Sequence, residues 1–161
     1  ITEDGQYEFY VERHDYEKDW SSGWVKENVI PFLHTDGHSH YEAGLLFYKW
    51  LKALPRQPDG YQICCDYEGD VHLLLDLLDG QDPFNIQEEP SYINSALFAE
   101  CVIVGASNDV DAVEVFDKAK HIFTESYIDY FYLNKLIQHH ALNDAKANRH
   151  AWLSALKFIR S

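Results

Sequence analysis

A five-residue apolar run places the tightest constraint on how this chain can fold. Residues 61–65 (YQICC) are bounded by Asp59-Gly60 before the run and by Asp66 after it. A short apolar segment between turn residues is consistent with a central β-strand that is buried on both faces. Because such a strand needs helices to cover its sheet, the run favours a fold that mixes strands with helices.

Helical periodicity dominates the remainder of the chain. We expect amphipathic helices at about residues 22–30, 41–54, 69–78, 108–133 and 141–159, from apolar residues spaced three and four apart. Ser21 or Ser22 is placed to cap the first helix, which Pro31 should stop, and Asn108 is a good N-cap for the fourth. Residues 101–105 (CVIVG) fit either another strand or the end of a buried helix. Residues 81–95 are expected to form a polar loop.

The N-terminal segment has strand character. Residues 6–16 (QYEFYVERHDY) are rich in aromatic side chains and partly alternate, and Glu3-Asp4-Gly5 before them is a hairpin turn signal. A hairpin needs a partner strand upstream, where only Ile1 and Thr2 stand. We therefore expect that the sequence starts inside a sheet and is a truncated form of a longer chain. Residues 1–161 are interpreted as a single α/β domain.

Composition excludes several classes of protein. The chain has 161 residues, 46% of them hydrophobic, which suffices for the core of one domain. No run approaches the roughly 18 apolar residues of a membrane helix, and no basic-then-apolar leader is present. Three cysteines, two of them adjacent at Cys64-Cys65, show no disulfide framework, which favours a reducing, cytoplasmic location.

Charge is distributed unevenly along the chain. The 27 acidic and 13 basic residues give a net charge of −14, which argues against a nucleic-acid binder that works by charge alone. Residues 121–161 carry five basic and three acidic side chains, so this segment is where we expect a polyanion to be attracted. A solvated helix face accounts for the same pattern.

Acidic residues at the ends of predicted elements suggest a metal-dependent reaction. Asp66 follows the expected central strand, and Asp70 lies four residues later in the first turn of the next helix. His139 precedes Asp144 by five residues at the start of the last helix. Two-metal phosphodiester hydrolysis needs carboxylates around ions about 3.5–4 Å apart and a base for the water. Taken singly, Asp70 and Asp144 are each better explained as partners of their helix dipoles, and it is the joint pattern that points to metal binding.

Three stretches resemble a known family of nucleases. Residues 139–145 (HHALNDA) are similar to the third motif of the DEDDh exonucleases, in which a histidine precedes an aspartate by five positions. Residues 66–70 (DYEGD) resemble their second motif, with Asp70 as the metal-binding aspartate and Asp66 where asparagine is common. Residues 9–33 are similar to a narrower subgroup, the bacterial 3′–5′ exoribonuclease domain first described in mycobacteria.

The resemblance implies a fold and an activity. The fold would be RNase H-like, a mixed sheet of five-stranded type flanked by helices, with its first strand truncated here. The activity would be removal of nucleotides from RNA, or DNA, 3′ ends with two Mg²⁺ or Mn²⁺ ions. Asp70 and Asp144 would bind metal and His139 would orient or deprotonate the attacking water, whereas His140 would be a packing neighbour. A homodimer is also implied.

The family's first motif, Asp-x-Glu on the opening strand, has no counterpart in residues 1–161. We expect it upstream of the turn at Glu3-Asp4-Gly5, and without it the chain should bind metal poorly and hydrolyse little. Three alternatives remain: a related module that binds nucleic acid or nucleotides without cleaving, an acidic protein-interaction domain, and a zinc enzyme. The zinc enzyme would use the neighbouring histidines His34, His38 and His40.

Overall fold

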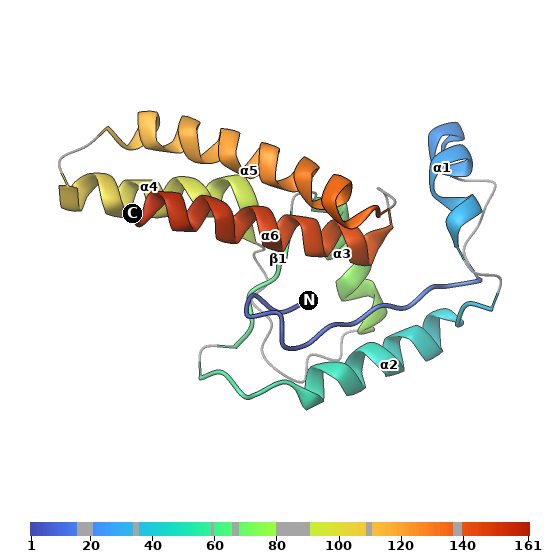
Figure 1. Cartoon of the computed structure of the whole chain (residues 1–161). Coiled ribbons are helices and arrows are strands. Elements are labelled where there is room, and N and C mark those ends of the chain that lie inside the picture. Colours follow the sequence, from blue (N-terminus) through green and yellow to red (C-terminus); the bar gives the residue numbers. More distant parts are fainter. Residues whose placement is uncertain are drawn as a thin grey trace.

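Helices make up most of the fold, beside a small parallel sheet (Figure 1). The computed structural model describes residues 1–15, 21–33, 36–58, 60–65, 68–79, 91–108, 111–136 and 140–161. The elements are α1 (Gly23–Asn28), the 3₁₀ turn η2 (Ile30–Phe32), α2 (His40–Ala53), β1 (Cys64–Cys65), α3 (Glu68–Leu77), β2 (Ser91–Tyr92), α4 (Ile93–Asn108), α5 (Ala112–Asn134) and α6 (Ala141–Ile159). In the sheet, Cys64 pairs with Ser91 and Cys65 with Tyr92. The prediction of a mixed α/β chain is confirmed.

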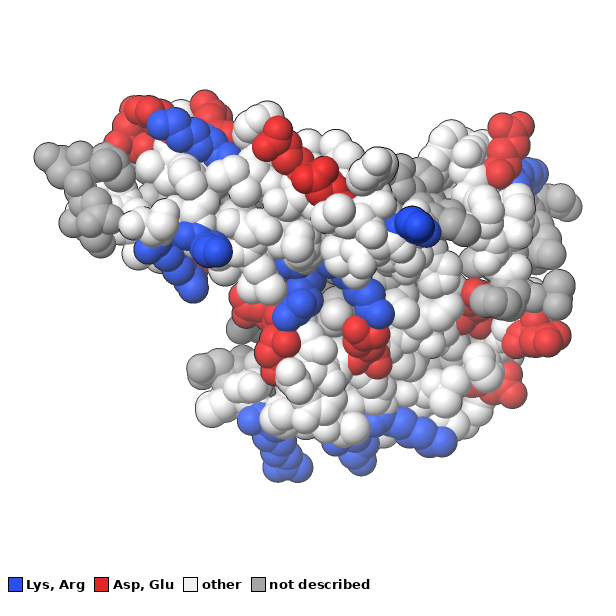
Figure 2. Space-filling model, viewed as in Figure 1, with Lys and Arg blue, Asp and Glu red and all other residues white. Residues whose placement is uncertain are grey.

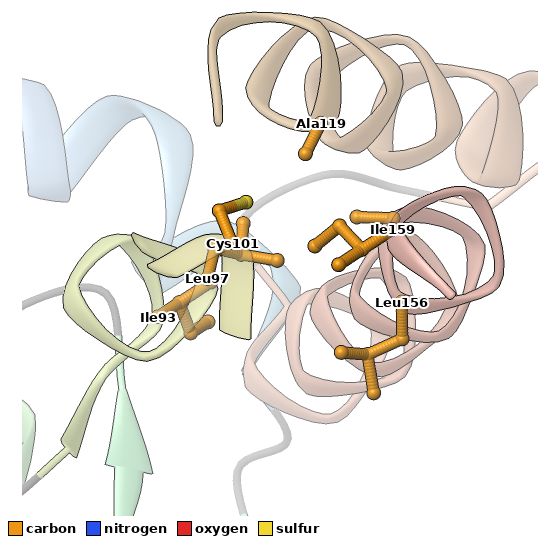
Figure 3. Close-up of a cluster of buried hydrophobic side chains, with 7 residues drawn as sticks. Ile93, Leu97, Cys101, Ala119, Leu156 and Ile159 are labelled. Carbon is orange, nitrogen blue, oxygen red and sulfur yellow. The ribbon is translucent and has the colours of Figure 1, made fainter. Parts of the chain in front are cut away.

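The three longest helices, α4, α5 and α6, lie side by side (Figure 1). The chain leaves α5 through Lys135, which adopts the left-handed conformation (φ 52°) that commonly ends a helix. Their shared core is drawn in Figure 3, and it consists of Ile93, Leu97, Cys101, Ala119, Ala155, Leu156 and Ile159. Alanines at the contact between α5 and α6 allow the two helix backbones to approach closely.

A second hydrophobic cluster lies under the N-terminal segment. Its buried residues are Phe47, Leu51, Leu54 and Leu78, from α2 and the end of α3. Phe9 packs on this cluster, with its ring centroid 5.3 Å from that of Phe47. Helix α2 begins with a complete capping box: the side chain of Ser39 accepts from the N–H of Glu42, whose carboxylate accepts from the N–H of Ser39. This cap fixes where α2 starts.

Several predicted elements are confirmed. The helix expected at 22–30 appears as α1, capped by Ser22, although Pro31 lies inside the 3₁₀ turn that follows. The helices expected at 41–54, 69–78 and 141–159 appear as α2, α3 and α6. The turn at residues 3–5 is also present: the N–H of Gly5 donates to the carbonyl of Thr2 at 2.9 Å. Of the strand expected at 61–65, residues 64–65 are paired. The prediction that it is buried on both faces is wrong, because Cys65 is buried whereas Cys64 is exposed.

The strand predicted for residues 6–16 is wrong over its described part, residues 6–15. Among those residues, Arg13 alone forms a bridge, which is parallel and joins it to His38. The backbone N–H of His38 donates to the carbonyl oxygen of Glu12 at 2.7 Å, and the N–H of His14 donates to the carbonyl oxygen of His38 at 3.0 Å. The alternation has another cause: Phe9 faces the cluster on α2 while Tyr10 stacks on His140 at the start of α6. The segment is extended because it runs between two layers of helices.

The C-terminal half needs three corrections. Residues 101–105 form part of α4 and not a strand, so the helical alternative holds, but the segment is not buried all round, because Val102 and Ile103 are exposed. Asn108 is the last residue of α4, and the N-cap of α5 is Asp111, whose side chain accepts from the N–H of Val113 at 2.8 Å. The loop predicted at 81–95 is wrong from residue 91, where β2 and then α4 begin, and residues 80–90 lie outside the described residues.

Within the described residues the sheet has two strands, so a sheet of five-stranded RNase H-like type stays a prediction. The described helices include none with both the length and the hydropathy needed to cross a bilayer.

Candidate functional site

The start of α6 carries Asp144, the aspartate of the segment that resembles the third DEDDh motif. Asp144 lies in the first turn of α6, and its N–H donates to the carbonyl of His140 at 2.9 Å. Its side chain is half-buried, and the hydroxyl of Tyr127 on α5 donates to its Oδ1 over 3.5 Å. The carboxylate is therefore held at the seam between α5 and α6 and oriented from across that seam.

His140 joins the start of α6 to the N-terminal segment. Its ring stacks on Tyr10, with the centroids 4.6 Å apart and the planes 27° apart. Its Nδ1 is buried and has no hydrogen-bond partner. The Tyr10 hydroxyl donates to the Glu12 carboxylate, and burial, together with that carboxylate, raises the pKa of Tyr10 well above its usual value. The stack on Tyr10 is thus a packing contact of His140.

The other predicted site residues are divided between α3 and segments outside the described residues. Asp70 lies on α3, where its side chain is exposed. His139 and Asp66 lie outside the described residues, and so does His34. Of the predicted site residues, the structure therefore places Asp70 on α3 and Asp144 on α6.

The described residues do not by themselves make a metal site. Carboxylate oxygens are the ligands that Mg²⁺ prefers, and both Asp70 and Asp144 can supply them. However, no group of three or more His, Cys, Asp or Glu side chains that could hold an ion occurs among the described residues. That finding includes His38 and His40 of the zinc alternative. A divalent ion would need further ligands beside these two aspartates.

Basic side chains of α6 dock the acidic N-terminal segment. Lys146 Nζ lies 2.7 Å from a carboxylate oxygen of Glu8, and Arg149 Nε donates to the carbonyl of Glu3 at 2.7 Å. The indole N–H of Trp152 donates to the carboxylate of Glu3 at 2.9 Å. We call these three contacts the clasp; in Figure 2, blue and red side chains meet near the centre of the view.

The clasp changes how the basic C-terminal segment is interpreted. Lys146 and Arg149 contact the N-terminal segment, and Arg160 pairs with Glu100 of α4 at 3.0 Å. Three of the five cations in residues 121–161 therefore have partners within the chain. A polyanion would have to compete for them, so the pattern in this segment reflects internal docking more than a solvated face.

Two cavities flank α6 on the side of the N-terminal segment. One, of about 210 Å³, is lined by Glu8, Lys146 and Arg149 of the clasp and by Tyr130 and His150, whose ring centroids lie 5.4 Å apart. The other, of about 320 Å³, lies between residues 10–13, the segment from α1 to Leu33, and His140-Ala141. The lining of the second cavity is largely apolar, and it includes His140 and Ala141 at the start of α6.

Tyr127, Tyr10 and Glu8 were not found by sequence reasoning. Tyr127 is 17 residues from the carboxylate that it contacts, and Tyr10 is 130 residues from His140. Such contacts have no local spacing that would reveal them. The one available signal was the acidic N-terminus set against a basic C-terminal segment.

Comparison of the chain with protein-family models found no matching family. Comparison with curated proteins found no match, and comparison with solved structures found none either. The assignment of a function therefore depends on the motifs and on the geometry around the start of α6.

Proposed function

We propose that this protein is a metal-dependent 3′–5′ exonuclease that acts on RNA, or DNA, 3′ ends and releases nucleoside 5′-monophosphates. The observation that carries the proposal is the position of Asp144. The five-residue spacing from His139 to Asp144 is that of the third DEDDh motif, and Asp144 is half-buried in the first turn of α6 beside Tyr127. A carboxylate that is oriented and partly shielded from water suits a metal ligand better than a freely solvated one.

The roles of the residues follow from their chemistry. Asp144 and Asp70 would bind Mg²⁺ or Mn²⁺, and His139 would orient or deprotonate water, since the histidine pKa lies near working pH. The described residues supply too few ligands for this, so the proposal requires further carboxylates. The proposal expects these further carboxylates at Asp66 and in the Asp-x-Glu motif of the family. An RNase H-like sheet, a homodimer and a cytoplasmic location belong to the same proposal.

The charge of the molecule sets a condition on substrate binding. With a net charge of −14, and with Lys146 and Arg149 in the clasp, long-range attraction of a polyanion is weak. Bound divalent ions would supply the missing positive charge and the Lewis acidity for phosphodiester hydrolysis. We therefore expect RNA binding to depend on the metal more than on surface lysines.

A second candidate is a module that binds nucleic acid or nucleotides without cleaving. One observation favours it: the described residues include no carboxylate or histidine cluster that could hold an ion. It differs from the first candidate in its metal requirement. A binding module should bind RNA with the same affinity in the presence and absence of chelator, and should not shorten the RNA.

The test is a cleavage assay on end-labelled RNA with a single-stranded 3′ end. The protein is used both as residues 1–161 and as the complete product of its gene, with Mg²⁺, with Mn²⁺ and with chelator. With a 5′ label, we expect a ladder that shortens from the 3′ end and is lost on chelation. With a 3′ label, we expect mononucleotide as the first product. A folded complete protein that leaves the RNA intact would favour the binding module.

A further inference from the structure

The basic side chains of α6 repeat on one face of the helix. Lys146 and Arg149 form a Lys-x-x-Arg pattern, which recurs 11 residues later as Lys157 and Arg160. Because each residue of a helix turns about 100° and rises about 1.5 Å, this spacing brings the pattern back to within about 20° of the same face, about 16 Å further along. Asp144, the one acidic residue of α6, lies about 160° round the helix from Lys146. We call the side of α6 that carries the two Lys-Arg pairs the basic face.

The two halves of the basic face differ in what covers them. Lys146 and Arg149 are partly buried by the clasp, which holds the N-terminal segment against them. Lys157 is exposed and has no ion pair with any residue that the structure describes. Arg160 pairs with Glu100, yet 60% of its side chain stays exposed. In Figure 2 blue side chains follow α6, and red ones adjoin the group near the centre of the view. The half beyond the clasp is therefore open to a partner.

The segment over the first half is acidic and is attached by few contacts. Residues 1–15 contain five acidic side chains against one arginine. Glu8 pairs with Lys146, and Arg149 donates through Nε to the backbone carbonyl of Glu3. Because a guanidinium carries five N–H donors, Arg149 keeps donors for an anion. Partly exposed ion pairs of this kind are weak, so a ligand with many negative charges can replace the segment.

We propose that the basic face of α6 binds the phosphate backbone of a single-stranded nucleic acid, and that the acidic N-terminal segment competes for its first half. Such a backbone carries a phosphate at every nucleotide, which suits two identical Lys-Arg pairs in line on one helix. Arginine also matches phosphate geometry with two parallel N–H donors. Carboxylates on an acidic protein have no such regular spacing. Since Asp144 lies on another side of α6, this surface goes beyond the proposed function and needs no metal.

The proposal sets the strength of binding and its dependence on salt. The net charge of −14 and the clasp both oppose a polyanion, so we expect weak binding by the parent protein. For single strands, the slope of log K against log salt is about −0.7 for each phosphate that is neutralised. Opening the clasp should steepen this slope from about −1.4, for Lys157 and Arg160 alone, to about −2.8, for both Lys-Arg pairs.

The test measures the binding of fluorescein-labelled oligothymidylate by anisotropy, in chelator and at several salt concentrations. Glu8→Gln breaks the ion pair with Lys146 and should raise the affinity about three- to fivefold. Glu114→Gln is the matched control, because it makes the same change of charge in a pair with Lys118 on α5, at 2.6 Å against 2.7 Å. The control should change the affinity by less than about twofold. Equal gains in the two variants would overturn the competition.

A second pair of variants locates the surface without touching the clasp. Lys157→Gln removes an exposed cation of the basic face, and Lys120→Gln removes an exposed lysine on α5. In the Glu8→Gln background, Lys157→Gln should weaken binding about threefold and make the salt slope shallower by about 0.7, whereas Lys120→Gln should do neither. A folded Lys157→Gln protein with unchanged affinity would contradict the proposal.

Two further measurements identify the partner and separate this inference from the proposed function. Poly-glutamate that displaces the oligothymidylate at equal charge would overturn the assignment to nucleic acid and indicate an acidic protein. RNA shortening in Mg²⁺ together with no binding in chelator would reject the basic face and leave the exonuclease proposal in place. Binding in chelator that follows the variants, without RNA shortening, would support the basic face and reject the exonuclease proposal.

Discussion

The bundle of α4, α5 and α6 and the N-terminal part of the chain, residues 1–79, are held together in different ways. In the bundle, neighbouring helices share a core in which Leu97, Cys101 and Ala119 have no exposed surface. In the N-terminal part the buried cluster around Phe47 and Leu51 is smaller, and residues 1–15 are joined to α6 by single contacts such as the ion pair of Glu8 with Lys146. The difference indicates that the bundle is the stable framework against which the N-terminal segment docks.

The largest effect should come from the core of the bundle. Leu97→Ala removes a fully buried side chain among three helices and should lower the free energy of unfolding by about 4 kcal/mol. Leu54→Ala, at the C-cap of α2 in the second cluster, should cost about 2 kcal/mol, because that cluster has fewer buried side chains. Urea denaturation of both variants measures the difference. Equal losses would contradict a dominant bundle.

The next effect concerns the contact of α2 with α3. A Cβ at Gly44 would lie 2.2 Å from the carbonyl oxygen of Leu77, so Gly44→Ala must push the two helices apart. We expect a loss of about 1–3 kcal/mol despite the higher helix propensity of alanine. Gly23→Ala is the matched control, since nothing lies within 4 Å of the added atom. A Gly44→Ala protein as stable as Gly23→Ala would mean that this contact is loose.

A smaller effect is expected from the clasp. Glu8 and Lys146 form a partly exposed pair, so Glu8→Gln should cost at most about 1 kcal/mol, and less at high salt. Loss of this pair should loosen the docking of residues 1–15 on α6. A protease should then cut residues 1–15 before it cuts the bundle. Thermal unfolding at two salt concentrations and limited proteolysis test this. Equal protease sensitivity of both regions would argue against a docked segment.

The smallest effect is a dependence on pH. The Asp15 carboxylate accepts from the N–H of His40 at 2.6 Å, and this bond, with the Arg13 guanidinium, holds the pKa of Asp15 below its ordinary value. A lowered pKa contributes stability above the unfolded-state value, about 3.9, that is lost as the pH falls through the lower folded value. In Asp15→Asn, the free energy of unfolding should therefore fall less steeply as the pH is lowered through the acidic range. The same pH dependence in the variant and the parent would show that this hydrogen bond does not contribute to stability.

How much of the fold the sequence predicts depends on how local the determinants are. Helix α2 was predicted because its apolar residues recur every three or four positions, a pattern that is local in the sequence. The segment 101–105 was ambiguous because a short apolar run fits both a strand and a buried helix, and tertiary packing decides between them. The strand over 6–16 failed because alternation is equally produced by an extended segment between two helical layers.

The candidate site follows the same division. Asp144 was found because its spacing from His139 is local, and its place in the first turn of α6 was predicted with it. Its contact with Tyr127 and the stack of His140 on Tyr10 depend on how α5 and the N-terminal segment pack. Sequence spacing thus indicates which residues carry the chemistry, and packing decides what orients them.

The most direct test of the account compares two aspartates at the starts of neighbouring helices. Asp144→Asn and Asp111→Asn are each measured for RNA cleavage in Mg²⁺ and for thermal unfolding, in the complete gene product. Both variants should fold, since asparagine replaces aspartate well near a helix N-terminus. We predict that Asp144→Asn abolishes 3′ shortening while Asp111→Asn retains it. Full activity of a folded Asp144→Asn protein would contradict the assignment of the reaction to the start of α6.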